Sequence, residues 1–301
     1  MKVLITGSSG QVGRALVAHL KRQWQGKAQL LALDAKELDI TQQAAVMVVV
    51  RAFLPDVIIN AAAYTAVDKA ESDEMTAYSV NCDGAKYLAQ AASEVGACIL
   101  HISTDYVFDG NKAECYHEAD FPVPQNVYGR SKLAGELAVI NACPRHVILR
   151  TSWVFAEQGN NFVNTMLSLA KTRESVSVVS DQFGSPTYAG DIASVLIEIA
   201  EQIVEGKQAW GIYHYSGLPH VSWYDFARAI FEQAKEQGLI SQPPRLKAIS
   251  SDDYPTPTKR PANTRLDCQK IEANFGIKPS DWQAALELLI ARKISSSAGN
   301  L

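Results

Sequence analysis

A tyrosine and a lysine lie four positions apart in the stretch Asn126-Val127-Tyr128-Gly129-Arg130-Ser131-Lys132. On a helix, residues i and i+4 share a face, so the Tyr128 phenol and the Lys132 ammonium can meet in one pocket. A nearby cation favours phenolate and lowers the pKa of a tyrosine from its usual value of about 10. The pair predicts proton transfer by Tyr128 near neutral pH, although Tyr-x-x-x-Lys alone is more often a solvated helix face.

Two other patterns make the catalytic interpretation the stronger one. The glycine-rich turn Gly7-Ser8-Ser9-Gly10-Gln11-Val12-Gly13 follows the first hydrophobic run, and Ser103-Thr104 ends another run about 25 residues before the tyrosine. Glycines let a backbone approach a pyrophosphate, and a following helix offers its N-terminal N–H groups to that anion. The turn therefore predicts a dinucleotide site, with a plain strand-to-helix connection as the alternative.

An acidic residue indicates which dinucleotide could bind. Asp34 ends the second predicted strand, where a carboxylate hydrogen-bonds an adenosine ribose and disfavours a 2′-phosphate. Lys36 lies two residues further on and could offset that charge. NADH and NADPH therefore both remain open.

Composition and cysteine use limit the other possibilities. The chain has 301 residues, of which 47% are hydrophobic and 20% charged, and its net charge of −4 argues against a nucleic-acid partner. Five scattered cysteines, none in C-x-x-C spacing, fit a reducing compartment and argue against disulfides or a zinc site. We expect no signal peptide, because the chain starts directly with the predicted strand around Lys2–Thr6. We expect no membrane partner, because the longest strongly apolar run, Ala44–Val50, is far too short to span a bilayer. A cytoplasmic enzyme is the expectation.

Short apolar runs alternate with amphipathic stretches through the first half of the chain. The predicted strands are Val3–Thr6, Leu30–Leu33, Val57–Asn60, Cys98–Ser103 and Val147–Arg150. The predicted helices are Gln11–Arg22, Gln42–Phe53, Glu74–Val95 and Val127–Asn141. This alternation predicts an α/β fold with a doubly wound parallel sheet, the Rossmann architecture.

The second half is less regular. A strand is expected at Tyr213-His214-Tyr215, helices at Ser222–Gln237 and Asp281–Ala291, and a loop at Ser250–Asn263, which holds three prolines. We expect residues 1–151 to form the NAD(P)-binding domain, with later segments crossing back to it. Residues 152–301 then form mainly a smaller substrate-binding domain.

Together these motifs resemble the extended short-chain dehydrogenase/reductase superfamily. Within it, five stretches are similar to the dTDP-4-dehydrorhamnose reductase family, and the resemblance runs from residue 2 to about residue 267. The stretches are Asn60–Glu71, Ser103–Gly110, Tyr128–Glu136, Arg150–Phe155 and Asp181–Thr187. The resemblance implies NAD(P)H-dependent reduction of the 4-keto group of a dTDP-linked 6-deoxysugar, with dTDP-L-rhamnose as the product.

The resemblance also implies roles for single residues. Tyr128 donates the proton, Lys132 lowers its pKa and holds the nicotinamide ribose, and Thr104 polarises the ketone, although a threonine is also common at a strand end. Asp105 and Trp153 match positions that contact the sugar. The residues assigned to the cofactor are Gly7, Gly10, Gln11, Val12, Gly13, Asp34, Asp39, Ile40, Ala63, Tyr64, Thr65, Ile102, Tyr128 and Lys132.

Other residues are assigned from their chemistry. Arg260 is a candidate for the substrate diphosphate, as is Arg265, since a guanidinium fork suits phosphate oxygens. Asn161 begins a predicted helix and could bind backbone or ligand. His101 lies in a predicted strand and is expected to be a satisfied core residue. The six histidines show no metal-ligand spacing. Some members of the family are associated with magnesium, but no site for it is assigned here, and a homodimer is left open.

Two alternatives remain beside the reductase. An epimerase or dehydratase of the same superfamily would use the same tyrosine and lysine but recycle its cofactor. Dehydratases typically carry Asp-Glu after the threonine, whereas Asp105 is followed here by Tyr106, and epimerases usually show Val-Tyr-Gly where this chain has Val107-Phe108-Asp109-Gly110. A non-catalytic regulatory subunit on the same fold would tend to lose the tyrosine or the lysine, and both are present.

Overall fold

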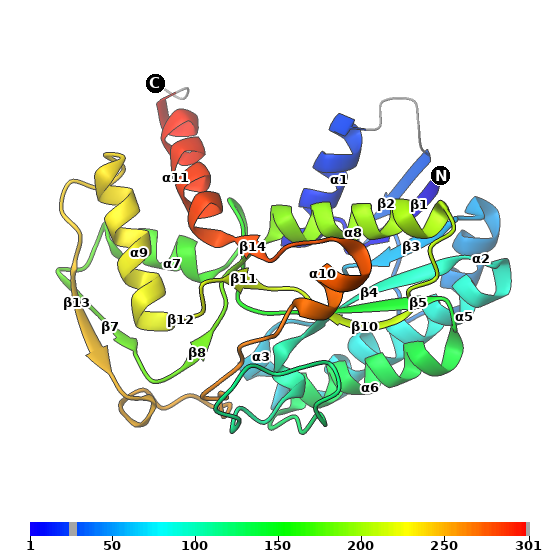
Figure 1. Cartoon of the computed structure of the whole chain (residues 1–301), viewed down its shortest axis with the longest axis horizontal. Coiled ribbons are helices and arrows are strands. Elements are labelled where there is room, and N and C mark those ends of the chain that lie inside the picture. The colour runs from blue at the N-terminus through cyan, green and yellow to red at the C-terminus, as the bar shows by residue number, and fades with distance from the viewer. Residues whose placement is uncertain (24–28, 299–301) are drawn as a thin grey trace.

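A six-stranded parallel sheet forms the centre of the molecule. The structure is a computed structural model that describes residues 1–23 and 29–298. The strand order is β10-β5-β4-β3-β1-β2 (Figure 1). These strands are β1 (Lys2–Thr6), β2 (Gln29–Leu33), β3 (Val57–Asn60), β4 (Cys98–Thr104), β5 (His146–Thr151) and β10 (Gly211–His214).

Helices cover both faces of this sheet, because successive side chains of a strand point to opposite faces and both sets are apolar here. On β1, Val3 and Ile5 pack in a core with α1 (Gln11–Gln23), α8 (Ala189–Val204) and α10 (Gln269–Phe275). Leu4, which lies between them, joins the core formed on the other face. That core is covered by α2 (Gln43–Phe53), α5 (Ala85–Val95) and α6 (Val127–Ala142). The predicted doubly wound parallel sheet is confirmed.

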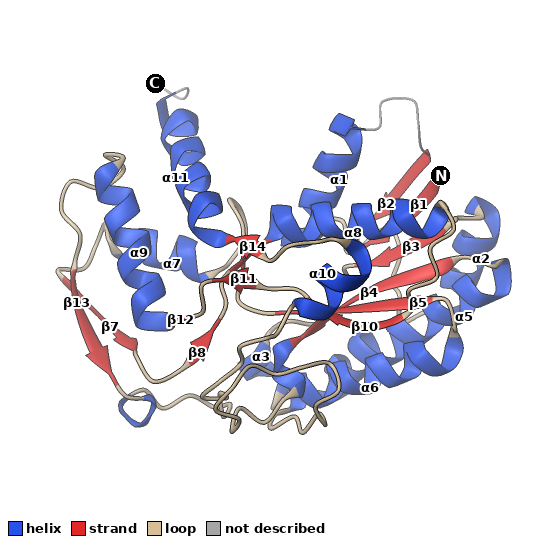
Figure 2. Ribbon diagram, viewed as in Figure 1, coloured by secondary structure: helices blue, strands red, loops and turns tan. Residues whose placement is uncertain are grey.

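A second lobe has a hydrophobic core of its own, and it lies beside the sheet in Figure 2. It contains a parallel pair of strands, β7 (Ser175–Val179) and β13 (Arg245–Ile249). Its helices are α7 (Phe162–Leu169), α9 (Trp223–Glu236) and α11 (Trp282–Ala298). Three short pairs link its segments, β6 (Val154–Phe155) with β9 (Thr187–Tyr188), β8 (Phe183–Gly184) with β12 (Val221–Ser222), and β11 (Gly217–Leu218) with β14 (Ser280–Asp281).

The chain returns from this lobe to the central sheet. Helix α8 packs on α1, and β10 pairs in parallel with β5 at the edge of the sheet. The expected strand around Tyr213 is therefore present as β10, and the two helices expected after it correspond to α9 and α11. The domain boundary at residue 151 stays a prediction.

The helix predicted over Glu74–Val95 is wrong in its middle. The chain forms a short α3 (Val67–Ala70), then α4 (Glu74–Tyr78), and Ser79–Gly84 follows as a π-helical segment before α5. Close backbone contacts accompany this segment, because a Cβ on Gly135 of α6 would overlap the Asn81 carbonyl. A π-turn adds one residue to the helix and changes the direction of the side chains that follow. Here it accompanies Asn81, whose side chain reaches the site described below.

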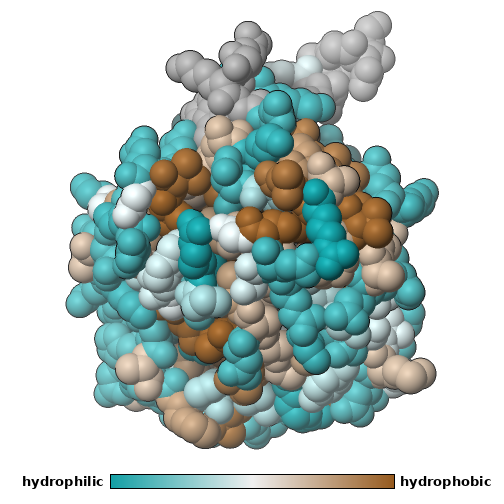
Figure 3. Space-filling view, turned by 90° about the vertical axis from the view of Figure 1, so that its right-hand side faces the viewer, coloured by the Kyte–Doolittle hydropathy of each residue, from teal (hydrophilic) through white to brown (hydrophobic). Residues whose placement is uncertain are grey.

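Short 3₁₀ turns at Asp105–Val107 and Ser251–Asp253 complete the elements. Figure 3 views the end of the molecule near α2, where hydrophilic residues dominate and hydrophobic ones form small separate patches. Exposed Val48 and Leu54 belong to this region, and scattered exposed apolar residues of this kind are normal. Within residues 1–23 and 29–298, every helix is too short or too polar to cross a membrane.

Candidate active site

The first turn of α6 is anchored on both sides. The Asn126 side chain caps the helix by accepting the N–H of Gly129 at 2.8 Å, and Glu71 accepts the N–H of Val127 at 2.8 Å. A Cβ on Gly129 would overlap the Tyr106 carbonyl, so glycine permits α6 to lie directly on the turn that follows β4. These contacts place Tyr128 beside the end of β4.

Tyr128, Thr104 and Asp105 form one hydrogen-bonded group. The Thr104 hydroxyl donates to Asp105 Oδ1 at 3.0 Å and accepts the N–H of Tyr106 at 3.2 Å. The Thr104 side chain also hydrogen-bonds the Tyr128 phenol. Burial raises the pKa of Tyr128, and the hydrogen bond with Thr104 counters that rise only in part. The phenol is therefore neutral at physiological pH and can donate a proton.

Lys132 lies one turn further along α6 and is almost fully buried. Its ammonium donates to the Ile102 carbonyl at 2.7 Å. Burial lowers the pKa of Lys132 to about 8, although the charge of Glu136 favours protonation. The expected lowering of the Tyr128 pKa by Lys132 is wrong for this structure, because burial of the phenol dominates and the ammonium is directed at a backbone carbonyl.

Two other buried polar residues support this cluster. His101 accepts a hydrogen bond from Asn60 Nδ2 at 3.0 Å, and burial holds its pKa well below the usual range. It is the satisfied core residue that the sequence predicts. Asp105 is also buried, and burial raises the pKa of its carboxyl to about 6, against hydrogen bonds from Thr264 and Thr104 that lower it. A carboxyl with a raised pKa, next to the candidate proton donor, marks Asp105 as a candidate functional residue.

The glycine turn forms a close-packed cradle at the start of α1. Gly7 has a φ of +72°, and a Cβ there would lie 2.5 Å from the Ala62 nitrogen. The N–H of Gly10 donates to the Gly7 carbonyl at 3.0 Å, and a Cβ on Gly13 would overlap that carbonyl. The three glycines therefore leave no side chain in front of the N-terminus of α1. Gln11 and Val12 lie in the first turn of this helix. This geometry fits the pyrophosphate of a dinucleotide.

Asp34 follows β2 at the same edge of the sheet as Gly7, because Thr6 pairs with Leu33. Its Oδ1 accepts the N–H of Lys36 at 2.8 Å and that of Glu37 at 3.2 Å, so one oxygen is used by a local turn. Asp39 forms a similar turn with Thr41, whose side-chain hydrogen bond lowers the pKa of the Asp39 carboxyl. Ile40, in contrast, is buried in the core.

The loop of residues 63–65 is held by Asn81. The Asn81 side chain accepts the N–H of Tyr64 at 2.8 Å and donates to the Tyr64 carbonyl at 3.1 Å. It also donates to the Ser131 hydroxyl at 3.0 Å, which lies between Tyr128 and Lys132 on α6. The segment Ala63–Thr65 is thus fixed between the glycine turn and the tyrosine.

Trp153 is covered on one face by another tryptophan. The rings of Trp153 and Trp223 stack with centroids 3.5 Å apart and planes at 9°. A Cβ on Gly184 would overlap the Trp153 indole, so glycine leaves room for that ring. Trp153 also has a φ of +44°, which is uncommon for a bulky residue. A sugar could therefore reach only part of this ring.

Arg260 lies beside the cluster, whereas Arg265 is held elsewhere. The Arg260 guanidinium donates to Asp68 at 2.9 Å and to the Tyr106 hydroxyl at 3.2 Å, and the Tyr106 ring meets that of Tyr128 edge-to-face at 5.6 Å. Arg265 donates to Asn263 at 2.9 Å and to a backbone carbonyl, which is a structural role.

Comparisons with known proteins find relatives that match nearly the whole chain. The family model described as RmlD substrate binding domain matches residues 1–294. The dTDP-4-dehydrorhamnose reductase of Aggregatibacter actinomycetemcomitans is 54% identical over 287 residues, which cover 95% of this chain and 97% of that protein. The chain belongs to the dTDP-4-dehydrorhamnose reductase family.

Solved structures of the family have the same fold. The enzyme from Clostridium acetobutylicum matches with a TM-score of 0.89 at 38% identity, covering 97% of this chain and 99% of that one. The enzyme from Bacillus anthracis, solved in complex with NADP, also gives 0.89, at 36% identity and the same coverage. Among residues 1–23 and 29–298 of the present chain, no group of three or more His, Cys, Asp or Glu side chains is arranged to hold a metal ion.

Several residues that shape this candidate active site received no role from the sequence alone. Glu136 accepts from Arg150 at 2.9 and 2.6 Å and from Ser103 at 2.5 Å, and thereby fixes α6 against β4 and β5. Its spacing from Lys132 was a usable signal, since both lie on one helix face. The pairing of Trp153 with Trp223 had no sequence signal.

Proposed function

We propose that the protein reduces the 4-keto group of dTDP-4-dehydro-L-rhamnose with NADPH or NADH and forms dTDP-L-rhamnose. The observation that carries this proposal is the buried Tyr128 phenol hydrogen-bonded to Thr104 at the end of β4. Membership of the dTDP-4-dehydrorhamnose reductase family supports the substrate, and the glycine cradle at α1 supports the dinucleotide.

Reduction of a ketone requires a hydride at carbon and a proton at oxygen. When bound, the reduced nicotinamide supplies the hydride. Tyr128 donates its phenolic proton to the ketone oxygen, and Thr104 helps to hold that oxygen in place. Lys132 supplies a positive charge close to the phenolate that remains, because its pKa of about 8 keeps most of it protonated at neutral pH.

The remaining assignments concern the substrate. We infer that Asp105 hydrogen-bonds a sugar hydroxyl and that the accessible part of Trp153 contacts the sugar ring. Arg260 uses two of its five N–H groups for Tyr106 and Asp68, which leaves others for diphosphate oxygens. The residue after Asp105 is Tyr106, whose hydroxyl accepts a hydrogen bond from Arg260. Because this position does not carry a second carboxylate, the site is not equipped for dehydration.

The test separates net reduction from internal recycling. The protein is incubated with NADPH and dTDP-4-dehydro-L-rhamnose while absorbance at 340 nm, a property of reduced nicotinamide, is followed. We expect one cofactor oxidised per sugar and, with cofactor deuterated at C4, label at C4 of the product sugar. Conversion of the sugar without cofactor oxidation would assign the protein to the epimerases or dehydratases. Cofactor binding without sugar conversion would favour a regulatory subunit. The cytoplasmic location and a homodimer stay predictions.

A further inference from the structure

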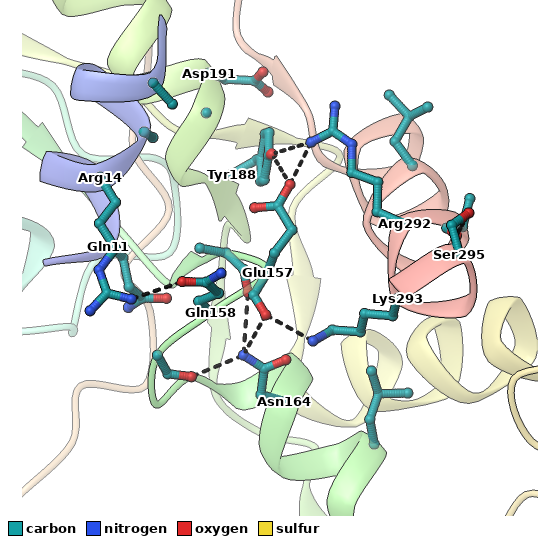
Figure 4. A pocket seen from close by; sticks show the side chains of 18 of the residues that line it. Gln11, Arg14, Glu157, Gln158, Asn164, Tyr188, Asp191, Arg292, Lys293 and Ser295 are labelled. Atoms are coloured by element: carbon teal, nitrogen blue, oxygen red, sulfur yellow. Dashed lines mark hydrogen bonds and ion pairs between the residues drawn. The ribbon is translucent and has the colours of Figure 1, made fainter. Parts of the chain in front are cut away.

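A large cavity lies apart from the Tyr128 cluster. Its volume is about 1500 Å³, and it is lined by α1, α7, α8, α11 and residues 156–159 of the loop that precedes α7. In Figure 4 side chains of this loop lie between Arg14 on one helix and Arg292 on another. The loop follows β6 and precedes α7, both of which contribute to the core of the second lobe.

The side of the loop that faces α11 is held by Glu157. Its carboxylate accepts from Arg292 at 2.5 Å and from the Tyr188 hydroxyl at 2.6 Å, and its backbone carbonyl accepts from Lys293 at 2.8 Å. The side chains of Arg292 and Glu157 are 57% and 32% exposed. Helix α11 and the loop are therefore joined by a partly exposed ion pair supported by two further hydrogen bonds.

The other side of the loop contacts α1. Gln158 accepts from Arg14 at 2.8 Å, and the Asn161 side chain donates to Gln11 Oε1 at 2.8 Å. Gly159, with a φ of +88°, approaches so closely that a Cβ there would lie 3.1 Å from Gln11 Cγ. Gln11 directly follows Gly10 and begins α1, so the loop rests on the turn that forms the dinucleotide cradle.

We propose that the loop of residues 156–161 is a positioning element for the dinucleotide cofactor, held by Glu157 on the α11 side and acting on Gln11 through Asn161. Neither Glu157 nor Arg292 needs to touch the cofactor. Their ion pair restrains the loop, the loop restrains Gln11, and the first turn of α1 keeps its N–H groups directed at the pyrophosphate. This inference rests on the cofactor half of the proposed function and is independent of the sugar.

The experiment measures NADPH and NADH affinity directly, by fluorescence titration of the full chain in the absence of sugar. We expect Glu157→Ala to weaken binding about threefold to fivefold, the size expected for a partly exposed ion pair. Glu157→Gln keeps an acceptor for Tyr188 and should recover part of the affinity. The matched control is Glu94→Ala, because Arg51 and Glu94 form a pair with the same 2.5 Å separation, 60% and 43% exposed, between α2 and α5. That variant should bind as the wild type does.

A double-mutant comparison tests the route. Asn161→Ser keeps a side chain able to cap α7 but is too short to reach Gln11, so it should also weaken cofactor binding. If Glu157 acts through Asn161, adding Glu157→Ala to Asn161→Ser should cause little further loss. Fully additive losses, or wild-type affinity in Glu157→Ala, would overturn the proposal and leave the reductase assignment intact. If these variants weaken cofactor binding as expected but the wild-type protein does not reduce the sugar, only the proposed substrate is overturned.

Discussion

The Lys132 ammonium lies 2.7 Å from the Ile102 carbonyl oxygen and donates a hydrogen bond to it. This contact fixes the lysine at the end of β4, one helical turn from Tyr128. It also places a charged group where little water reaches, which is why its pKa falls to about 8.

The first prediction concerns pH. Lys132 is mostly protonated at pH 7 and loses its proton as pH rises through about 8, so kcat should fall along an alkaline limb near that value. Lys132→Met should lower kcat and weaken cofactor binding, and its remaining activity should lack this limb. A pH profile of kcat for both proteins checks this, and an unchanged limb in the variant would assign it to another group.

Tyr128→Phe keeps the ring in its packing against Tyr106 and removes only the transferable proton. Loss of one positioned general acid typically lowers a rate by about 10²–10⁴-fold. We therefore expect a fall in kcat of that size, with cofactor affinity near that of the wild type. Steady-state kinetics and a direct titration measure the two effects. More than half the wild-type turnover in this variant would remove Tyr128 from the mechanism.

Asp34→Ala should change cofactor preference. Removing a negative charge from the end of β2 favours a 2′-phosphate, so the ratio of kcat/KM for NADPH over NADH should rise. Because Asp34 also accepts two backbone N–H groups, a small loss of thermal stability should accompany the change. An unchanged ratio would place a different residue, such as Asp39, at the ribose.

Asp105→Asn should stabilise the protein above pH 6. In the folded protein the Asp105 pKa is raised to about 6, above its unfolded value of about 4, so the folded state holds this proton more tightly. The contribution of the Asp105 carboxyl to the free energy of unfolding is fully present below pH 4 and is lost as pH rises through 6. At pH 8 the neutral asparagine should therefore gain about 2–3 kcal/mol in the free energy of unfolding. Urea unfolding at pH 5 and pH 8 should show a larger gain at pH 8, while sugar binding weakens.

Glu136→Ala should destabilise the fold strongly. The side chains of Arg150 and Glu136 are 2% and 1% exposed, and removing the carboxylate leaves a buried guanidinium without its ion-pair partner. Breaking such a pair typically costs about 3–5 kcal/mol. Urea unfolding measures the loss. The control is the double variant Glu136→Leu with Arg150→Met, which removes both charges and should recover much of the stability.

The sheet and the region of the tyrosine, lysine and threonine followed from local patterns. The carboxyl ends of parallel strands meet at one edge of a sheet, so Gly7 and Thr104 had to lie at the same edge. Helical spacing then placed Lys132 one turn after Tyr128 on the same face of the helix. Helix α8 was missed although its signal exists, since Ile192, Leu196 and Ile199 recur at helical spacing.

Other features depend on contacts that no local pattern contains. The stacking of Trp153 on Trp223 joins segments from two parts of the second lobe, and the ion pair of Arg260 with Asp68 joins the two halves of the chain. The Tyr128 pKa was misjudged because spacing indicates which charges are near but not how deeply a phenol is buried. Packing of the whole chain decides that depth.

The position of β10 determines when this protein can fold during its synthesis. The strand that closes the sheet beside β5 is made only after about 60 further residues, which include α8, have followed β5. At bacterial or eukaryotic elongation rates of about 5–20 residues per second, the ribosome needs several seconds for that segment. During this interval β5 has an open edge, and the face later covered by α8 is exposed to water. A nascent chain released near residue 151 would therefore expose this edge and this apolar face, and the sheet is complete only once β10 has been made, before α9, β13 and α11 of the second lobe.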